Sequence, residues 1–99
     1  MDKKYVFIFV REDLSFPVQI VQSCHAVYEL GKSQTSNNEH FVHCTVSSEE
    51  LDRIEGICIN NNLNFEIFYE PDNNLGYTSL ATIVNEVDKK IFKKYNITK

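Results

Sequence analysis

Four short segments of the chain carry the apolar patterns that are typical of β-strands. Tyr5 to Val10 (YVFIFV) is apolar at every position, and Tyr77 to Val84 also lacks a clean alternation of apolar and polar residues. A strand without alternation presents apolar side chains on both faces, which is typical of the covered centre of a sheet. His40 to Val46 and Phe65 to Tyr69 predict two further strands. We therefore expect Tyr5–Val10 and Tyr77–Val84 to be the central strands.

A first helix is predicted between the first two strands. Ser15 is a suitable N-cap, Pro17 fits the first turn, and Gly31 is expected to end the helix near residue 30. Helical spacing places two polar residues, Gln22 and His25, on one apolar stripe. The apolar members of that stripe are Val18, Val21 and Tyr28. Polar side chains on such a stripe are either satisfied inside the core or border a pocket.

Two more helices are predicted further along the chain. Ser47 and Glu50 form a capping box before a helix that ends at the asparagines 60–62. After the fourth strand, a last helix is expected to pack through its apolar stripe of Val87, Ile91 and Tyr95. The order β-α-β-α-β-β-α alternates first and then closes with two consecutive strands. It predicts one α/β domain over residues 1–99, a sandwich of a four-stranded mixed sheet with helices on both faces.

The charge of the chain limits its partners. The net charge is −4, and seven of the ten basic residues lie at the two ends of the chain. Proteins that bind nucleic acid usually present a basic face, and this chain has one only if its two ends meet. The longest apolar run has six residues, whereas a membrane span needs about 20. The first residues lack the pattern of a secretory signal, so we expect a cytoplasmic protein without membrane contact.

Neither a metal nor a cofactor is expected from the sequence. His40, His43 and Cys44 are metal-ligating residue types close together. In a strand, however, positions 40 and 43 point to opposite faces, and no second cluster supplies further ligands. The three cysteines are an odd number without a CxxC pair, which argues against a disulfide framework. Three glycines leave no glycine-rich loop for phosphate.

Residues able to do chemistry gather in the loops at one edge of the predicted sheet, where ligands bind in α/β folds. These loop and strand-end residues are Arg11, Asp13, Asp72, Asn74, Gly76 and Thr78. A carboxylate near a histidine holds the ring in one tautomer and stabilises its charged form. His25, Asp72 and Thr78 are therefore candidates to handle a water molecule and a polarised ester or phosphate. The competing interpretation of His25 is an ordinary core histidine.

Three segments together resemble one protein family. Residues 10–26 (VREDLSFPVQIVQSCHA) resemble the first strand, loop and helix of the type 2 peptidyl-tRNA hydrolases. Residues 65–83 (FEIFYEPDNNLGYTSLATI) resemble the aspartate loop, Gly-x-Thr step and final strand of that family. Residues 89–94 (KKIFKK) resemble the closing helix of short relatives from phages and bacteria.

The resemblance implies an activity and a set of roles. The family hydrolyses, without a metal, the ester that joins a peptide to the 3′ end of tRNA, and it usually assembles as a dimer. The catalytic positions would be His25, Asp72 and Thr78. The substrate-binding positions would be Arg11, Asp13, Gln19, Gln22, Asn74 and Gly76. Gln19 stands where the family has a lysine, so an amide replaces a cation that could steady an oxyanion.

Three functions follow as hypotheses. The first is a divergent peptidyl-tRNA hydrolase, or a relative that cleaves another nucleotide-bearing ester, with the tRNA 3′ end as its partner. The second is a binding protein that has lost catalysis and holds a small nucleotide ligand. The third is a structural or interaction domain. A homodimer is expected under the first two, because so many aromatic side chains are hard to cover on a small monomer.

Overall fold

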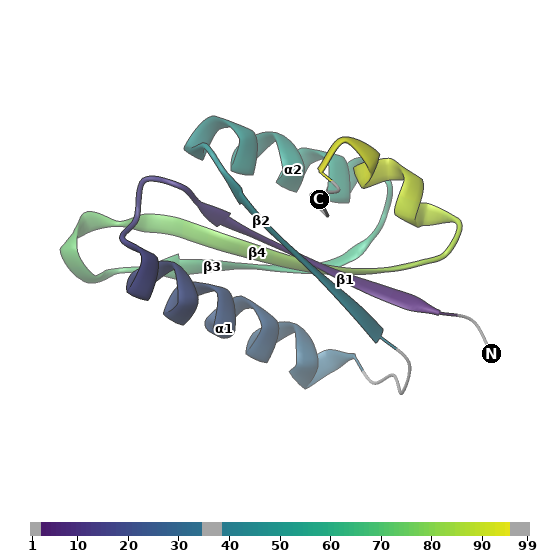
Figure 1. Cartoon of the computed structure of the whole chain (residues 1–99), viewed down its shortest axis with the longest axis horizontal. Helices are drawn as coiled ribbons and strands as arrows, with labels where there is room; N and C mark the ends of the chain where they lie inside the picture. Colours follow the sequence, from purple (N-terminus) through teal and green to yellow (C-terminus); the bar gives the residue numbers. More distant parts are fainter. Residues whose placement is uncertain (1–2, 35–38, 96–99) are drawn as a thin grey trace.

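The structure, a computed structural model, describes residues 3–34 and 39–95. In chain order its elements are β1 (Lys4–Arg11), α1 (Phe16–Ser33), β2 (Glu39–Val46), α2 (Ser48–Asn60), β3 (Asn64–Glu70), η1 (Asp72–Asn74), β4 (Gly76–Asn85) and η2 (Asp88–Tyr95). The strands form one sheet in the order β2-β1-β4-β3, with β1 parallel to β2 and the other pairs antiparallel. Figure 1 shows α1 on one face and α2 with η2 on the other. The predicted α/β sandwich is confirmed.

The two central strands are those that the sequence predicts. Val6 to Val10 of β1 are all buried, because the strand has helices over both of its faces. β4 is buried from Thr78 to Thr82 and contains hydroxyl side chains that would be costly without partners. Each has one: Thr78 and Ser79 donate to Gln22, and Thr82 donates to the backbone oxygen of Asn64. The polar groups of the sheet centre are therefore satisfied.

The larger core lies between the sheet and the α2–η2 layer. Its buried residues are Phe7, Phe9, Cys44, Val46, Leu51, Ile54, Cys58, Leu80, Val84 and Phe92. Burial raises the pKa of the Cys44 and Cys58 thiols to about 11, so both stay protonated at neutral pH. The predicted cap at the start of α2 is confirmed for Ser47, whose side chain accepts a hydrogen bond of 3.0 Å from the Glu50 backbone N–H, whereas the Glu50 carboxylate pairs with Arg53 and Lys94 instead of closing a capping box.

The first helix packs through a different stripe from the one predicted. Its buried residues are Gln22, Ser23, Ala26 and Leu30, whereas Val21 and Tyr28 are exposed. The small side chains of Ser23 and Ala26 let α1 lie close to the sheet. The predicted end at Gly31 is also wrong, because α1 continues to Ser33. No helix in the described part of the chain is both long and apolar enough to cross a membrane.

The last helix also differs from its prediction. It has the tighter 3₁₀ geometry, with a kink at Phe92. Val87 lies before the helix and is 69% exposed, whereas Ile91 and Tyr95 pack against the core as predicted, beside the fully buried Phe92. A stripe counted at α-helical spacing misplaces residues in a 3₁₀ helix, which has three residues per turn.

Candidate functional site

Gln22 is the centre of a buried polar chain that links α1 to β3 and β4. Thr78 Oγ1 donates a hydrogen bond of 2.6 Å to Gln22 Oε1, and Gln22 Nε2 donates one of 3.1 Å to Glu70 Oε1. Thr78 has no exposed surface and Gln22 has 4%. Because the hydroxyl occupies the amide oxygen, the amide nitrogen must point outward to Glu70. Thr78 is thus a positioning residue, since its hydroxyl is not accessible to a ligand.

Glu70 and Asp72 place two carboxylates at the outer end of this chain. Asp72 donates its backbone N–H to Glu70 Oε2 at 3.3 Å. The hydrogen bond from Gln22, followed by that from the Asp72 backbone, lowers the pKa of Glu70. Glu70 is therefore ionised at neutral pH. Sequence analysis missed this residue, although its place between a strand and the aspartate loop was a usable signal.

The two carboxylates border an open groove of about 310 Å³. Its lining residues are Pro17, Val18, Val21, Gln22, Glu70, Asp72, Asn73 and Leu75. One wall, from α1 and Leu75, is apolar, and the other carries the negative charges. A groove of this kind is suited to a ligand that combines an apolar group with neighbouring N–H donors. Among residues 3–34 and 39–95, no group of three His, Cys, Asp or Glu side chains is placed to hold a metal ion.

The turn between β3 and β4 has an unusual backbone that shapes the groove. Asn73, Asn74 and Gly76 have φ values of +58°, +56° and +72°. Asparagine and glycine are the residues that enter this left-handed region most readily. Gly76 is the one glycine among these three residues. Asn74 lies exposed on the same turn and does not line the groove.

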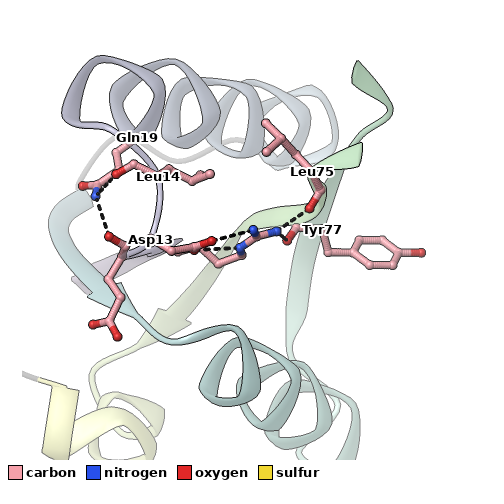
Figure 2. A network of polar contacts seen from close by, with 7 residues as sticks. Asp13, Leu14, Gln19, Leu75 and Tyr77 are labelled. Carbon is pink, nitrogen blue, oxygen red and sulfur yellow. Dashed lines mark hydrogen bonds and ion pairs between the residues drawn. The ribbon is translucent and has the colours of Figure 1, made fainter. Parts of the chain in front are cut away.

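Arg11 fixes this turn to the end of β1, as Figure 2 shows. Its Nη1 donates to the backbone oxygens of Leu75 and Tyr77, the second at 3.0 Å. Its Nε and Nη2 donate to the two carboxylate oxygens of Asp13 at 3.0 and 2.8 Å. These bonds raise the pKa of Arg11 and lower that of Asp13. Direct binding of substrate by Arg11 or Asp13 would require these bonds to break.

Gln19 has a similar structural role on the other loop. Its Nε2 donates to the backbone oxygen of Leu14 at 2.9 Å and, more weakly, to that of Glu12 at 3.5 Å (Figure 2). The amide therefore closes the turn between β1 and α1. Gln19 is not among the residues that line the groove. The structure thus places Arg11 at the end of β1, Asp13 in the following turn and Gln19 in the first part of α1, where they support the groove rather than line its walls.

His25 does not face inward as its predicted stripe required. It is exposed, and its ring stacks on Phe68 of β3 with the centroids 4.4 Å apart and an interplanar angle of 4°. On the helix, His25 lies on a different side from the buried Gln22 and Ala26, and it faces the seam between α1 and β3. Its charge makes a small contribution to the lowered pKa of Glu70. Gln22 and Asp72 therefore line the groove. Thr78 is buried behind Gln22, and His25 lies at the seam between α1 and β3 without lining the groove.

One further polar pair lies on the other side of α1. Ser23 Oγ and His43 Nε2 share a hydrogen bond of 2.9 Å that ties α1 to β2. Nothing in the sequence predicts this pair, because it joins two elements through the fold alone. His43 keeps an exposed surface, but the covered part of its ring loses hydration, and this lowers its pKa below the ordinary value of 6.5. The folded state therefore favours the neutral ring.

This pair makes folding stability depend on pH. The unfolded chain binds a proton at His43 more readily than the folded chain does. The stabilisation of the folded state by the neutral His43 ring is therefore complete above pH 6.5, and it is lost as the pH falls through the lower pKa of the folded state. We expect His43→Gln to reduce the loss of stability below pH 6.5 in urea unfolding series. His40→Gln, on the opposite face of β2, is the control and should retain the slope. An unchanged slope in His43→Gln would contradict this assignment.

The buried chain makes a second prediction, on stability. Thr78→Val leaves Gln22 Oε1 without its donor, and Gln22→Met leaves the Thr78 hydroxyl without its acceptor. Each change is expected to cost about 1–3 kcal/mol of unfolding free energy, because a buried polar atom loses its partner. The double variant should cost clearly less than the sum of the two, since it removes both partners. Additive losses in urea unfolding would show that the two side chains are not coupled.

Comparison with known proteins shows a similarity of fold. No protein-family model and no curated protein sequence matches the chain. Among solved structures, the chain is similar to Atu0240, a protein of unknown function from Agrobacterium tumefaciens strain C58. The TM-score is 0.72 at 10% identity, and the match covers 99% of this chain and 96% of that chain. At this identity the likeness shows the fold alone.

Proposed function

We propose that the groove beside Gln22 hydrolyses an ester, and that its substrate is peptidyl-tRNA or a related nucleotide-bearing ester. The observation that supports this proposal is the chain from Thr78 through Gln22 to Glu70, which ends at an open groove next to Asp72. Side chains held in one orientation by buried partners are the arrangement that catalysis requires. The substrate class comes from the resemblance of residues 10–26 and 65–83 to type 2 peptidyl-tRNA hydrolases.

The proposed reaction gives a role to each of these four residues. Asp72 takes a proton from a water molecule while the water oxygen attacks the carbonyl carbon of the ester. The second N–H of Gln22 donates to the carbonyl oxygen as it becomes negative, and the first stays on Glu70. The carbon–oxygen bond of the ester then breaks, and the proton on Asp72 passes to the leaving 3′ oxygen. Thr78 holds the amide of Gln22 in the required orientation.

The charge of the groove indicates which part of the substrate it would hold. Glu70 and Asp72 attract the N–H groups of a peptide, and the wall of Pro17, Val18 and Leu75 suits apolar side chains. The same carboxylates would repel phosphate groups. We therefore place the acyl part of the ester in the groove and the nucleotide outside it.

One observation favours a second function, the binding of a ligand without turnover. No lysine or arginine is among the residues that line the groove in the described part of the chain, and the amide of Gln19 supports a loop instead. A hydrolase of this kind would therefore rely on Gln22 alone to stabilise the oxyanion. A binding protein has no such requirement.

The experiment measures binding and cleavage separately. Purified protein is mixed with peptidyl-tRNA and, in parallel, with a panel of linear and cyclic nucleotides. Release of free peptide and tRNA reports cleavage, and filter retention or calorimetry reports binding. Multiple turnovers of peptidyl-tRNA would support the hydrolase. Binding of a ligand that is recovered intact would support the binding protein, and neither result with any ligand would contradict both.

A further inference from the structure

A second cavity lies on the opposite face of the sheet, between η2 and the start of β1. Its volume is about 380 Å³, which is within the range of small-molecule sites. Tyr5 lines this cavity, whereas Arg11, at the other end of β1, holds the turn beside the groove. Six residues of strand separate the two positions by about 20 Å. The cavity is thus independent of the site described above.

Aromatic rings form the inner surface of this cavity. Phe7 and Phe92 are almost completely buried, and their ring centroids are 5.1 Å apart. Tyr5 stands beside them, half-buried, and is held in place by stacking on His40 at 5.4 Å between centroids. Val42 completes the apolar surface. A flat apolar group in the cavity would contact the edges of these rings and the Val42 side chain, which is a favourable environment for an aromatic ligand.

Three lysines of η2 line the same cavity. Lys89 is already engaged, because its Nζ lies 4.3 Å from the Tyr5 ring centroid and 3.9 Å from Glu86 Oε2. Lys90 and Lys93 are exposed and make no ion pair with any residue that the structure describes. They lie on either side of the kink at Phe92, and both line the cavity, so their like charges share one site. Two adjacent like charges repel each other, and a bound anion would relieve that repulsion.

The fold produces this concentration of positive charge by joining the two ends of the chain. Lys4 at the start of β1 pairs with Asn85 at the end of β4, and η2 follows directly. Lys4 therefore lies next to the segment that leads into the η2 lysines, on a protein whose net charge is −4. The lysines have no role in the proposed ester hydrolysis.

We propose that this cavity binds a small organic phosphate that carries an aromatic ring. The ring lies in the cavity against Tyr5 and Val42, with the packed pair of Phe7 and Phe92 at its floor, and the phosphate contacts the ammonium groups of Lys90 and Lys93. A lysine is a compact charge on a flexible stem, which suits phosphate without requiring a fixed geometry. A phosphate monoester carries close to two negative charges at neutral pH and so matches the two lysines.

Adenosine 5′-monophosphate is a suitable probe, with adenosine and inorganic phosphate as its two separate parts. Calorimetry should show that the full nucleotide binds at least tenfold more tightly than either part. Lys90→Gln combined with Lys93→Gln should weaken its binding at least tenfold. Lys32→Gln combined with Lys94→Gln is the matched control, because it removes the same charge from residues outside the cavity. That control should bind within twofold of the unchanged protein.

A third variant tests the ring separately. Val42→Phe fills the cavity while leaving the lysines in place, and it should also weaken binding at least tenfold, with folding checked by thermal unfolding. Three results would overturn the proposal: no binding of the nucleotide, equal binding of inorganic phosphate, or equal loss in the two double-lysine variants. Loss of binding in Asp72→Asn but not in Lys90→Gln/Lys93→Gln would also overturn it, because the ligand would then occupy the groove.

Discussion

Asp72→Asn is expected to lower the rate of peptidyl-tRNA cleavage by about 10²–10⁴-fold, the usual effect of removing a general base. The asparagine keeps the shape of the side chain and the backbone N–H that Glu70 accepts, but it cannot take a proton from water. Asp72 is exposed on the turn, so its replacement should leave the free energy of unfolding within about 0.5 kcal/mol of its original value. Single-turnover cleavage and urea unfolding would measure the two effects.

Asp52→Asn is the matched control for this experiment. Asp52 is an exposed carboxylate on α2, on the face of the sheet opposite the groove, and its replacement changes the net charge by the same amount. It should cleave at the original rate. Equal rates in all three proteins would remove Asp72 from the mechanism. If the unchanged protein binds its ligand without cleavage, Asp72→Asn should instead weaken that binding.

Phe9→Ala is expected to cost about 3–5 kcal/mol of unfolding free energy, the largest effect of any single core substitution considered. Phe9 has no exposed surface and lies on the central strand β1. Its ring is within 5.5 Å of the Phe92 ring and 5.3 Å of the Tyr95 ring, between centroids. Removing it would leave a cavity where the sheet meets η2, which a rigid central strand cannot close. Urea unfolding followed by circular dichroism would measure the loss.

Phe41→Ala is the control for this variant, because it removes the same ring from an exposed position. Phe41 is 59% exposed and lies on the edge strand β2. Its replacement should cost less than about 1 kcal/mol, because little buried surface is lost. Comparable losses in the two variants would contradict the description of the core.

The central strands were predictable because a strand that is covered on both faces has an apolar sequence without alternation. Tyr5–Val10 has no polar residue, and only a central strand tolerates that. All four strands extend the predicted segments by at most one residue at either end. The cap at Ser47 was equally local, since Ser47 and Glu50 lie within one turn. Such features need no knowledge of the rest of the fold.

The orientation of α1 could not be obtained in the same way. Its apolar residues occur on both its buried and its exposed sides, so their spacing does not identify the side that packs. Ile20 and Tyr28 are about half exposed or more, while the buried stripe contains Gln22 and Ser23. The sequence pattern therefore identified Gln22 as an unusual polar position but placed His25 beside it wrongly. Only the fold brings a partner, Thr78, to Gln22 from 56 positions away.

The position of β4 has a consequence for the synthesis of the chain. β4 is the last strand to be made, yet it lies between β1 and β3, and its pairing joins Lys4 to Asn85. Until β4 has left the ribosome, β1 and β2 can pair with each other, but β3 has no neighbour and β1 keeps one edge open. Folding that depends on such distant pairing is slow, and an open apolar edge attracts other chains. We expect aggregation of nascent or truncated chains to begin at β1.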